Sequence, residues 1–162
     1  MTRLAPPPER TTPARTGAPI VLDTNLWIDA ARDAPARRAL NDFLAERGHR
    51  VVMLSVVAQE LAAGIGDARR ARELRGTLAP FEEGRRTLAV SYAAELEAGR
   101  VLAALSAAEG IDLSRLGASF LNDVRIATAC REHRALLVTR NRGDFAAVQR
   151  HLAAFRFAAP WP

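Results

Sequence analysis

Two acidic side chains early in the sequence follow apolar residues instead of lying in a polar stretch. Asp23 directly follows the aliphatic run Ile20–Leu22. A charged group at the end of a buried element costs free energy unless something pairs with it. Glu60 follows Val56 and Val57 in a helical pattern, and residues three and four apart share one helix face. Both carboxylates are therefore predicted to border the core.

Two further acids occur in the second half of the chain. Asp123 precedes Ile126 and Ala127 by three and four positions, which places it on the core-facing side of a predicted helix. Asp144 opens another predicted helix, after the segment Thr139–Asn141. These four acids, Asp23, Glu60, Asp123 and Asp144, are the candidate catalytic and metal-binding residues.

Each acid also has a simpler explanation when it is considered alone. Asp23 could cap the helix that begins near Leu26, because aspartate is a preferred N-cap. Glu60 could be an ordinary solvated glutamate. Asp123 and Asp144 could each lie in the first turn of a helix, where a carboxylate favours the positive end of the helix dipole. The shared pattern of apolar neighbours argues against applying these explanations to all of them.

Carboxylates that crowd together need a counter-charge, because each raises the pKa of the others. The chain contains no lysine to supply one. Mg²⁺ or Mn²⁺ would suit the site, since both take hard oxygen ligands. Zinc is disfavoured because Cys130 and His133 have a C-x-x-H spacing that no second pair matches. We expect Cys130 to pack inside a helix interface and His133 to lie at the surface.

An acid cluster that holds Mg²⁺ is suited to phosphodiester hydrolysis. Such a metal lowers the pKa of a bound water and neutralises charge on the leaving oxygen, so no protein nucleophile is needed. The sequence has no G-x-S-x-G elbow, no Walker-type loop and no G-x-G-x-x-G loop. Acyl transfer by a serine and nucleotide-cofactor chemistry therefore lack support.

The elements that must position these residues alternate between strand and helix. Short apolar runs predict strands at 20–22, 51–54, 87–90, 135–138 and 155–157. Helical patterns cover 26–31, 36–47, 56–65, 68–78, 92–109, 120–132 and 144–152, with breaks near Pro35 and at Pro80 and a loop over 110–119. This alternation predicts a three-layer α/β/α sandwich around a short, mostly parallel sheet.

In such sheets the site lies beyond the carboxyl ends of the strands. Asp23 and the segment Thr139–Asn141 follow two predicted strands at that end.

Composition fits one domain over residues 19–162, because 162 residues with 49% hydrophobic side chains can bury a sizeable core. Residues 1–18 are rich in proline and arginine and predict a disordered tail.

The single cysteine fits a reducing compartment. Apolar stretches are too short to span a membrane, and the N-terminus lacks the apolar core of a signal peptide. We expect a cytoplasmic protein without membrane association.

The net charge of +5 comes entirely from arginine, and residues 131–156 contribute +4 of it. A GC-rich genome is one explanation for the arginine excess. Contact with a polyanion is the other. Arg131, Arg134, Arg140 and Arg142 flank the candidate site in sequence, and their guanidinium groups are candidates for contacts to RNA phosphates.

Four blocks of this sequence resemble the PIN-domain nucleases, and most of all the VapC-type toxin ribonucleases of bacterial toxin–antitoxin pairs. The blocks are IVLDTN (20–25), SVVAQELAAG (55–64), NDVRIATACREH (122–133) and LLVTRNRGDF (136–145). Arg125 stands where many members of the family carry an aliphatic residue.

The resemblance implies a Mg²⁺- or Mn²⁺-dependent endoribonuclease whose metal site is lined by Asp23, Glu60, Asp123 and Asp144. It implies that Thr24, Asn25, Thr139 and Asn141 shape that site. A homodimer and a protein antitoxin that blocks the site are the implied partners.

Alternatives stay open at this point. The chain could be a PIN-fold RNA-binding protein or a housekeeping nuclease outside any toxin–antitoxin pair. A haloacid-dehalogenase-like phosphatase also carries an aspartate after its first strand. That class usually needs a second aspartate where Asn25 stands, and a lysine.

Overall fold

Runs of aliphatic residues form the strands, because a strand of a parallel sheet is covered on both faces. A computed structural model describes residues 17–110 and 112–161. Its five strands form one parallel sheet in the order β3-β2-β1-β4-β5. Their bounds are β1 Ile20–Leu22, β2 Val51–Leu54, β3 Thr87–Leu88, β4 Leu136–Val138 and β5 Arg156–Ala158.

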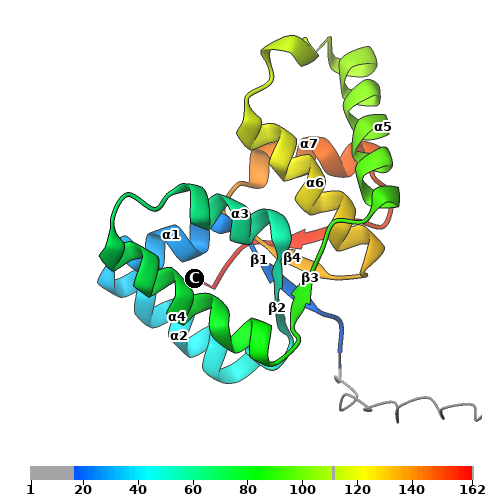
Figure 1. Cartoon of the computed structure of the whole chain (residues 1–162). Helices are drawn as coiled ribbons and strands as arrows, with labels where there is room; N and C mark the ends of the chain where they lie inside the picture. The colour runs from blue at the N-terminus through cyan, green and yellow to red at the C-terminus, as the bar shows by residue number, and fades with distance from the viewer. Residues whose placement is uncertain (1–16, 111, 162) are drawn as a thin grey trace, which may run out of the picture.

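The helices form two layers, one on each side of the sheet (Figure 1). The first layer contains α1 Thr24–Arg32, α2 Ala34–Arg47, α3 Ser55–Ala63 and α4 Ala68–Glu83. The second contains α5 Tyr92–Glu109, α6 Ala118–Glu132 and α7 Arg142–His151, with a short 3₁₀ helix at Leu113–Arg115. The predicted three-layer α/β/α sandwich is confirmed.

The strand order creates a switch point between β1 and β4. From β1 the chain moves outward to β2 and β3, then returns through α5 and α6 to β4 and continues to β5. The backbone N–H of Asp23 donates to the carbonyl of Val138 at 2.9 Å, which ties the ends of β1 and β4 together. Ligand sites of open parallel sheets lie at the carboxyl ends of such strands.

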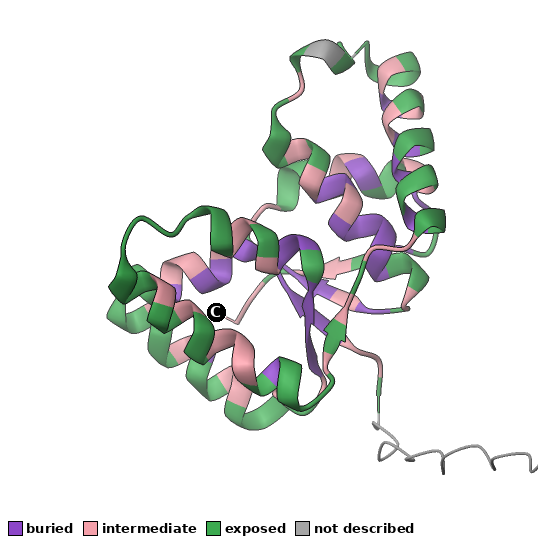
Figure 2. Cartoon of the chain, in the orientation of Figure 1, coloured by how far each residue is buried: buried purple, intermediate pink, exposed green. Residues whose placement is uncertain are grey.

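The core occupies both faces of the sheet, as the buried strands and the inward helix faces indicate (Figure 2). Leu22, Leu54 and Leu137 are almost fully buried in the strands. Each such side chain stabilises the fold by about 1.5–3 kcal/mol relative to an exposed one. This packing holds the strand ends, and the side chains that follow them, in fixed positions.

The predicted break near Pro35 is confirmed, since α1 ends at Arg32 and α2 begins at Ala34. Pro35 does not interrupt a helix, because it lies in the first turn of α2, where its missing N–H has no helical partner to lose. The break falls two residues earlier, at Asp33, whose carboxylate caps α2 by accepting from the N–H of Ala36 at 2.8 Å.

Pro80 was predicted to end its helix, and this prediction is wrong, because α4 continues to Glu83. Phe81 is buried there and packs edge-on against Trp27, with ring centroids 5.9 Å apart. Arg86 donates to the carbonyl of Pro80 at 3.3 Å. These contacts outweigh the single hydrogen bond that a proline near a helix end removes.

Most other boundaries agree with the prediction to within two residues. The helix over 92–109 is confirmed, and Gly110 ends it with a φ of 67°, a conformation that favours glycine. The helix that carries Asp123 begins at Ala118 instead of residue 120. Within the described part of the chain, no helix is long and apolar enough to cross a membrane. Residues 1–16 of the predicted tail lie outside the described residues.

Candidate active site

Asp23 caps a helix and also belongs to a buried polar cluster. It follows β1 and is the N-cap of α1, with Oδ1 accepting from the Thr24 N–H at 2.8 Å. Its other oxygen, Oδ2, accepts from Asn25 Nδ2 at 2.6 Å and from Thr139 Oγ1 at 2.5 Å. The capping explanation is therefore correct, and it leaves the second oxygen facing the end of β4.

Thr139 joins the end of β4 to this carboxylate. Its side chain is completely buried. The hydroxyl that donates to Asp23 also accepts from the Asn141 backbone N–H at 2.9 Å and from Asn25 Nδ2 at 3.3 Å. Thr139 thereby fixes Asp23 and the loop that leads into α7.

Glu60 enters the cluster from α3. Its Oε2 accepts a hydrogen bond from the Thr24 hydroxyl. Its Oε1 accepts from Asn122 Nδ2 at 2.8 Å. Since α3 and α6 belong to opposite helix layers, the bond from Asn122 joins the two layers at the carboxyl end of the strands.

Asn141 brings the remaining two acids together. Its Nδ2 lies 3.0 Å from Asp123 Oδ2 and 2.9 Å from Asp144 Oδ2. Asn141 is also the N-cap of α7, and Asp144 lies in the first turn of that helix, exposed to solvent. Asp123 is buried beyond the first turn of α6, so the helix-dipole explanation is wrong for Asp123.

The charges of the four acids act on one another. Burial raises the pKa of Asp123 to about 8, and the charges of Asp23, Asp144 and Glu60 add to the effect. Burial also raises the pKa of Asp23, although hydrogen bonds from Thr139 and Thr24 partly offset it. No salt bridge among the described residues joins any of the four to a positive side chain. No positive side chain among the described residues therefore compensates the acid cluster when its members are ionised.

A hollow of about 280 Å³ opens over part of this cluster. Its lining comes from the start of α1, from α3 and from the start of α6: Asp23, Thr24, Asn25, Ile28, Glu60 and Ser119. The hollow therefore combines a buried acid, Asp23, and a half-buried acid, Glu60, with an opening to solvent.

The sequence matches the PIN domain family over residues 20–151, which is most of the chain. The chain belongs to the PIN domain family. The resemblance predicted from the four sequence blocks is confirmed.

Solved structures share this PIN fold. A chain of the DNA-bound VapBC complex from Salmonella typhimurium superposes with a TM-score of 0.66 at 20% identity, covering 88% of this chain and 98% of that chain. VapBC2 from Rickettsia felis, bound to a promoter DNA fragment, gives a TM-score of 0.60 at 20% identity, with coverage of 88% and 98%. VapBC-1 from nontypeable Haemophilus influenzae gives 0.59 at 20% identity, with coverage of 86% and 96%. A comparison with curated proteins found no match.

The carboxylates of this PIN domain are close enough to interact but do not converge on a point. Over residues 17–110 and 112–161, no three His, Cys, Asp or Glu side chains lie close enough together to hold one ion. The side chains of Thr24 and Asn122 donate to Glu60, and Asn141 donates to both Asp123 and Asp144. The carboxylate oxygens of the four acids are nevertheless ligands of the chemical type that a hard divalent cation prefers.

The four predicted phosphate-binding arginines divide into two groups. Arg140 and Arg142 flank Asn141 at the site, and Arg140 forms a salt bridge with Asp29 at 3.1 Å. Arg131 and Arg134 lie at and just after the end of α6, before β4 begins. Arg131 is therefore separated from Asp123 by roughly 12 Å along the helix axis.

Sequence reasoning missed Asn122 as a member of the site. Asn122 precedes Asp123 directly and is only half-buried. Its contact with Glu60 spans 62 positions in the chain, so no local spacing indicated it. Ser119 was missed for a related reason, because α6 begins earlier than predicted.

Cys130 and His133 behave as expected. Cys130 is buried, and burial raises the pKa of its thiol. His133 is partly exposed, and its Nε2 lies 3.7 Å from Glu132 Oε2.

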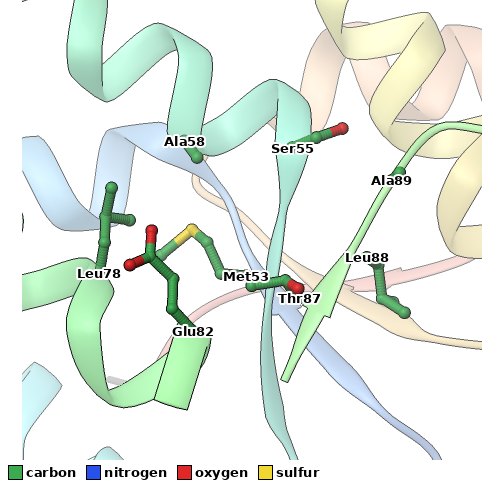
Figure 3. Close-up of a pocket in the computed structure, with 8 residues that line it drawn as sticks. All are labelled: Met53, Ser55, Ala58, Leu78, Glu82, Thr87, Leu88 and Ala89. Carbon is green, nitrogen blue, oxygen red and sulfur yellow. The ribbon is translucent and has the colours of Figure 1, made fainter. Parts of the chain in front are cut away.

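A second hollow, of about 250 Å³, lies beside the edge strand β3 and has a mostly apolar lining (Figure 3). Met53, Leu78 and Leu88 contribute much of that lining, and Glu82 is its one charged residue. It shares no residue with the acid cluster. Its chemistry does not suggest a reaction.

Proposed function

We propose that this PIN domain is a divalent-metal-dependent endoribonuclease, and that it is the toxin of a type II toxin–antitoxin pair. The observation that carries the proposal is the acid cluster. Four carboxylates come from the end of β1 and from α3, α6 and α7, and the pKa of Asp123 rises to about 8 because Asp123 is buried and because the charges of the other three add to the effect of burial. Mg²⁺ or Mn²⁺ would relieve that repulsion.

Asp23, Glu60, Asp123 and Asp144 would hold the metal. When bound, such an ion lowers the pKa of a water ligand and neutralises charge on the leaving oxygen of a phosphodiester. Since the carboxylates do not converge on one point, holding a metal would require their side chains to rotate and would release hydrogen bonds such as that from Asn141 to Asp123. The backbone of Asp23 is held at the end of β1, and the backbones of the other three acids are held in α3, α6 and α7.

The remaining polar residues keep these carboxylates oriented. Thr139 and Asn25 donate to Asp23, which leaves its ionised form better stabilised than burial alone would allow. Thr24 donates to Glu60. Asn141 holds Asp123 and Asp144 together with a neutral donor, so it adds no charge that would compete with a cation.

The arginines near the site support RNA as the substrate. The similarity to solved structures supports a protein antitoxin as the partner. Arginines near the site could bind phosphates on either side of the scissile bond. The similar solved structures include VapBC complexes and a toxin–antitoxin complex from Klebsiella pneumoniae. A homodimer and a cytoplasmic location stay predictions.

The decisive experiment measures cleavage of labelled RNA by the full chain with Mg²⁺, with Mn²⁺ and with EDTA. Asp23→Asn should abolish metal-dependent cleavage without unfolding the protein, because asparagine caps a helix as well as aspartate does. Asp33→Asn is the matched control, because the Asp33 carboxylate also caps a helix, α2, but lies outside the cluster. Cleavage that persists in EDTA, or in Asp23→Asn, would refute the mechanism.

The toxin assignment has its own test. Induced expression should stop cell growth, and co-expression of the product of a neighbouring small gene with a DNA-binding fold should restore growth. An active nuclease that leaves growth unaffected would be a housekeeping enzyme instead.

A further inference from the structure

The orientation of Glu60 depends on side chains outside the four acids. Glutamate has more rotatable bonds than aspartate, so its carboxylate needs more support to stay in one place. One oxygen is held by Thr24 of α1, and the other by Asn122 of α6 at 2.8 Å. Asn122 is the contact that crosses from one helix layer to the other.

Asn122 can give its amide nitrogen to Glu60 only if its amide oxygen points the other way. That oxygen accepts a hydrogen bond from Arg125 Nη1 at 3.3 Å. Because an arginine can only donate, this contact fixes which end of the amide faces Glu60.

Arg125 is held in turn by Glu95 of α5. Its Nη2 lies 2.7 Å from Glu95 Oε1, and its Nε lies 3.0 and 3.1 Å from the two carboxylate oxygens. The planar guanidinium therefore has a fixed direction, which a lysine in its place would not have. The contacts form a relay from Glu95 through Arg125 and Asn122 to Glu60.

The relay has an electrostatic consequence. Glu95 neutralises Arg125, and a neutral amide stands between Arg125 and Glu60. The acid cluster is thus oriented by an arginine whose charge is compensated elsewhere. An arginine bound directly to Glu60 would compete with a cation for that carboxylate.

We propose that Asn122 and Arg125 are positioning residues that orient Glu60 for binding a divalent cation. The inference rests on the proposed function, because the orientation of Glu60 matters for binding only if Glu60 is a metal ligand. If Arg125 only held α6 against α5, its contact with Glu95 would be sufficient, and its contact with Asn122 would not be needed.

The test is the affinity of the full chain for Mn²⁺ at pH 7, measured by calorimetry. Asn122→Ala should weaken Mn²⁺ binding by about 10- to 100-fold, the usual effect of removing a residue that supports a metal ligand. Arg125→Leu should weaken it by a smaller factor. The double variant should bind no more weakly than Asn122→Ala, because Arg125 acts through Asn122.

Arg150→Leu is the matched control. Arg150 also pairs with a glutamate of α5, with Nη2 2.7 Å and Nε 3.2 Å from Glu109 Oε1, but the pair contacts none of the four acids. Arg150→Leu and Arg125→Leu should lower the melting temperature alike, and only Arg125→Leu should weaken Mn²⁺ binding.

Glu60→Gln separates the two possible failures. If the wild-type protein binds Mn²⁺ and Glu60→Gln weakens it, while Asn122→Ala binds like wild type, the positioning inference is overturned and the proposed function stands. If the wild-type protein binds no Mn²⁺, the proposed function fails, and the inference fails with it.

Discussion

The side-chain nitrogen of Asn141 lies 3.0 Å from Asp123 Oδ2, and this contact joins the loop after β4 to the middle of α6. The same nitrogen lies 2.9 Å from Asp144 Oδ2. An amide NH₂ group has two hydrogens, so both are used. Asn141 thus keeps two carboxylates at hydrogen-bonding distance from one neutral donor.

Asn141→Asp should destabilise the protein when no divalent ion is present. It replaces the shared donor with another negative charge, and losing hydrogen bonds to charged groups costs about 1–3 kcal/mol. Saturating Mn²⁺ should then raise the melting temperature more in the variant than in wild type, because the added carboxylate favours a cation. Thermal unfolding with EDTA and with Mn²⁺ measures both effects.

The control for this variant is Asn41→Asp on the exposed surface of α2. It adds the same charge far from the acids and should change the free energy of unfolding by less than about 0.5 kcal/mol. Equal destabilisation by the two substitutions would contradict the role assigned to Asn141.

Thr139→Val should lower the free energy of unfolding more than the same substitution at a typical buried threonine. The Thr139 hydroxyl hydrogen-bonds to Asp23, Asn141 and Asn25, so removing it takes one donor from the buried Asp23 carboxylate and the acceptor from the Asn141 N–H. The expected cost is about 1–3 kcal/mol of unfolding free energy, measured with urea. Thr128→Val is the comparison, since Thr128 is equally buried but its hydroxyl only bonds back to the Arg125 carbonyl. Similar costs for both would show that the Thr139 contacts contribute little.

Stability without metal should fall as the pH rises from 5 to 8. The pKa of Asp123 is about 3.9 in an unfolded chain and about 8 in the fold, so the folded state binds more protons in this window. Stability then decreases with pH, by on the order of 1 kcal/mol per pH unit while Asp123 alone dominates. The raised pKa of Asp23 acts in the same direction.

Asp123→Asn should flatten that dependence, because asparagine does not titrate. Mn²⁺ should flatten it as well, since a cation stabilises the ionised acids. Urea unfolding at several pH values, with and without Mn²⁺, tests this. A wild-type protein that gains stability between pH 5 and 8 in EDTA would contradict the assigned cause.

The sequence predicted the sheet because strands covered on both faces read as unbroken aliphatic runs, as at Val51–Leu54. It predicted that Asp23, Glu60 and Asp123 border the core. Asp23 follows an apolar strand, and the other two share a helix face with apolar residues. Helix boundaries were harder. Pro80 normally ends a helix, and only the packing of Phe81 against Trp27, a contact distant in sequence, reveals why it does not.

The polar contacts could not have been predicted. Asn122 reaches Glu60 across 62 positions, and Thr139 reaches Asp23 across 116. Such bonds depend on the final arrangement of layers, and no local pattern encodes them. The pairing of Arg140 with Asp29 is of the same kind, and it changes how freely Arg140 can meet a phosphate.

The positions of Arg142 and Arg131 predict that the two residues contribute differently to RNA binding. Arg142 begins α7 beside Asn141, whereas Arg131 lies at the far end of α6. In an Asp23→Asn background that cannot cleave, Arg142→Ala should weaken binding of a short single-stranded RNA. Each lost phosphate contact should also reduce the slope of log affinity against log salt by about 0.7. Arg131→Ala should change neither quantity, and binding measured by fluorescence anisotropy at several salt concentrations distinguishes them. If Arg131→Ala weakens binding as much as Arg142→Ala, the bound RNA also reaches the end of α6, and the assignment of RNA binding to the Asn141 loop is wrong.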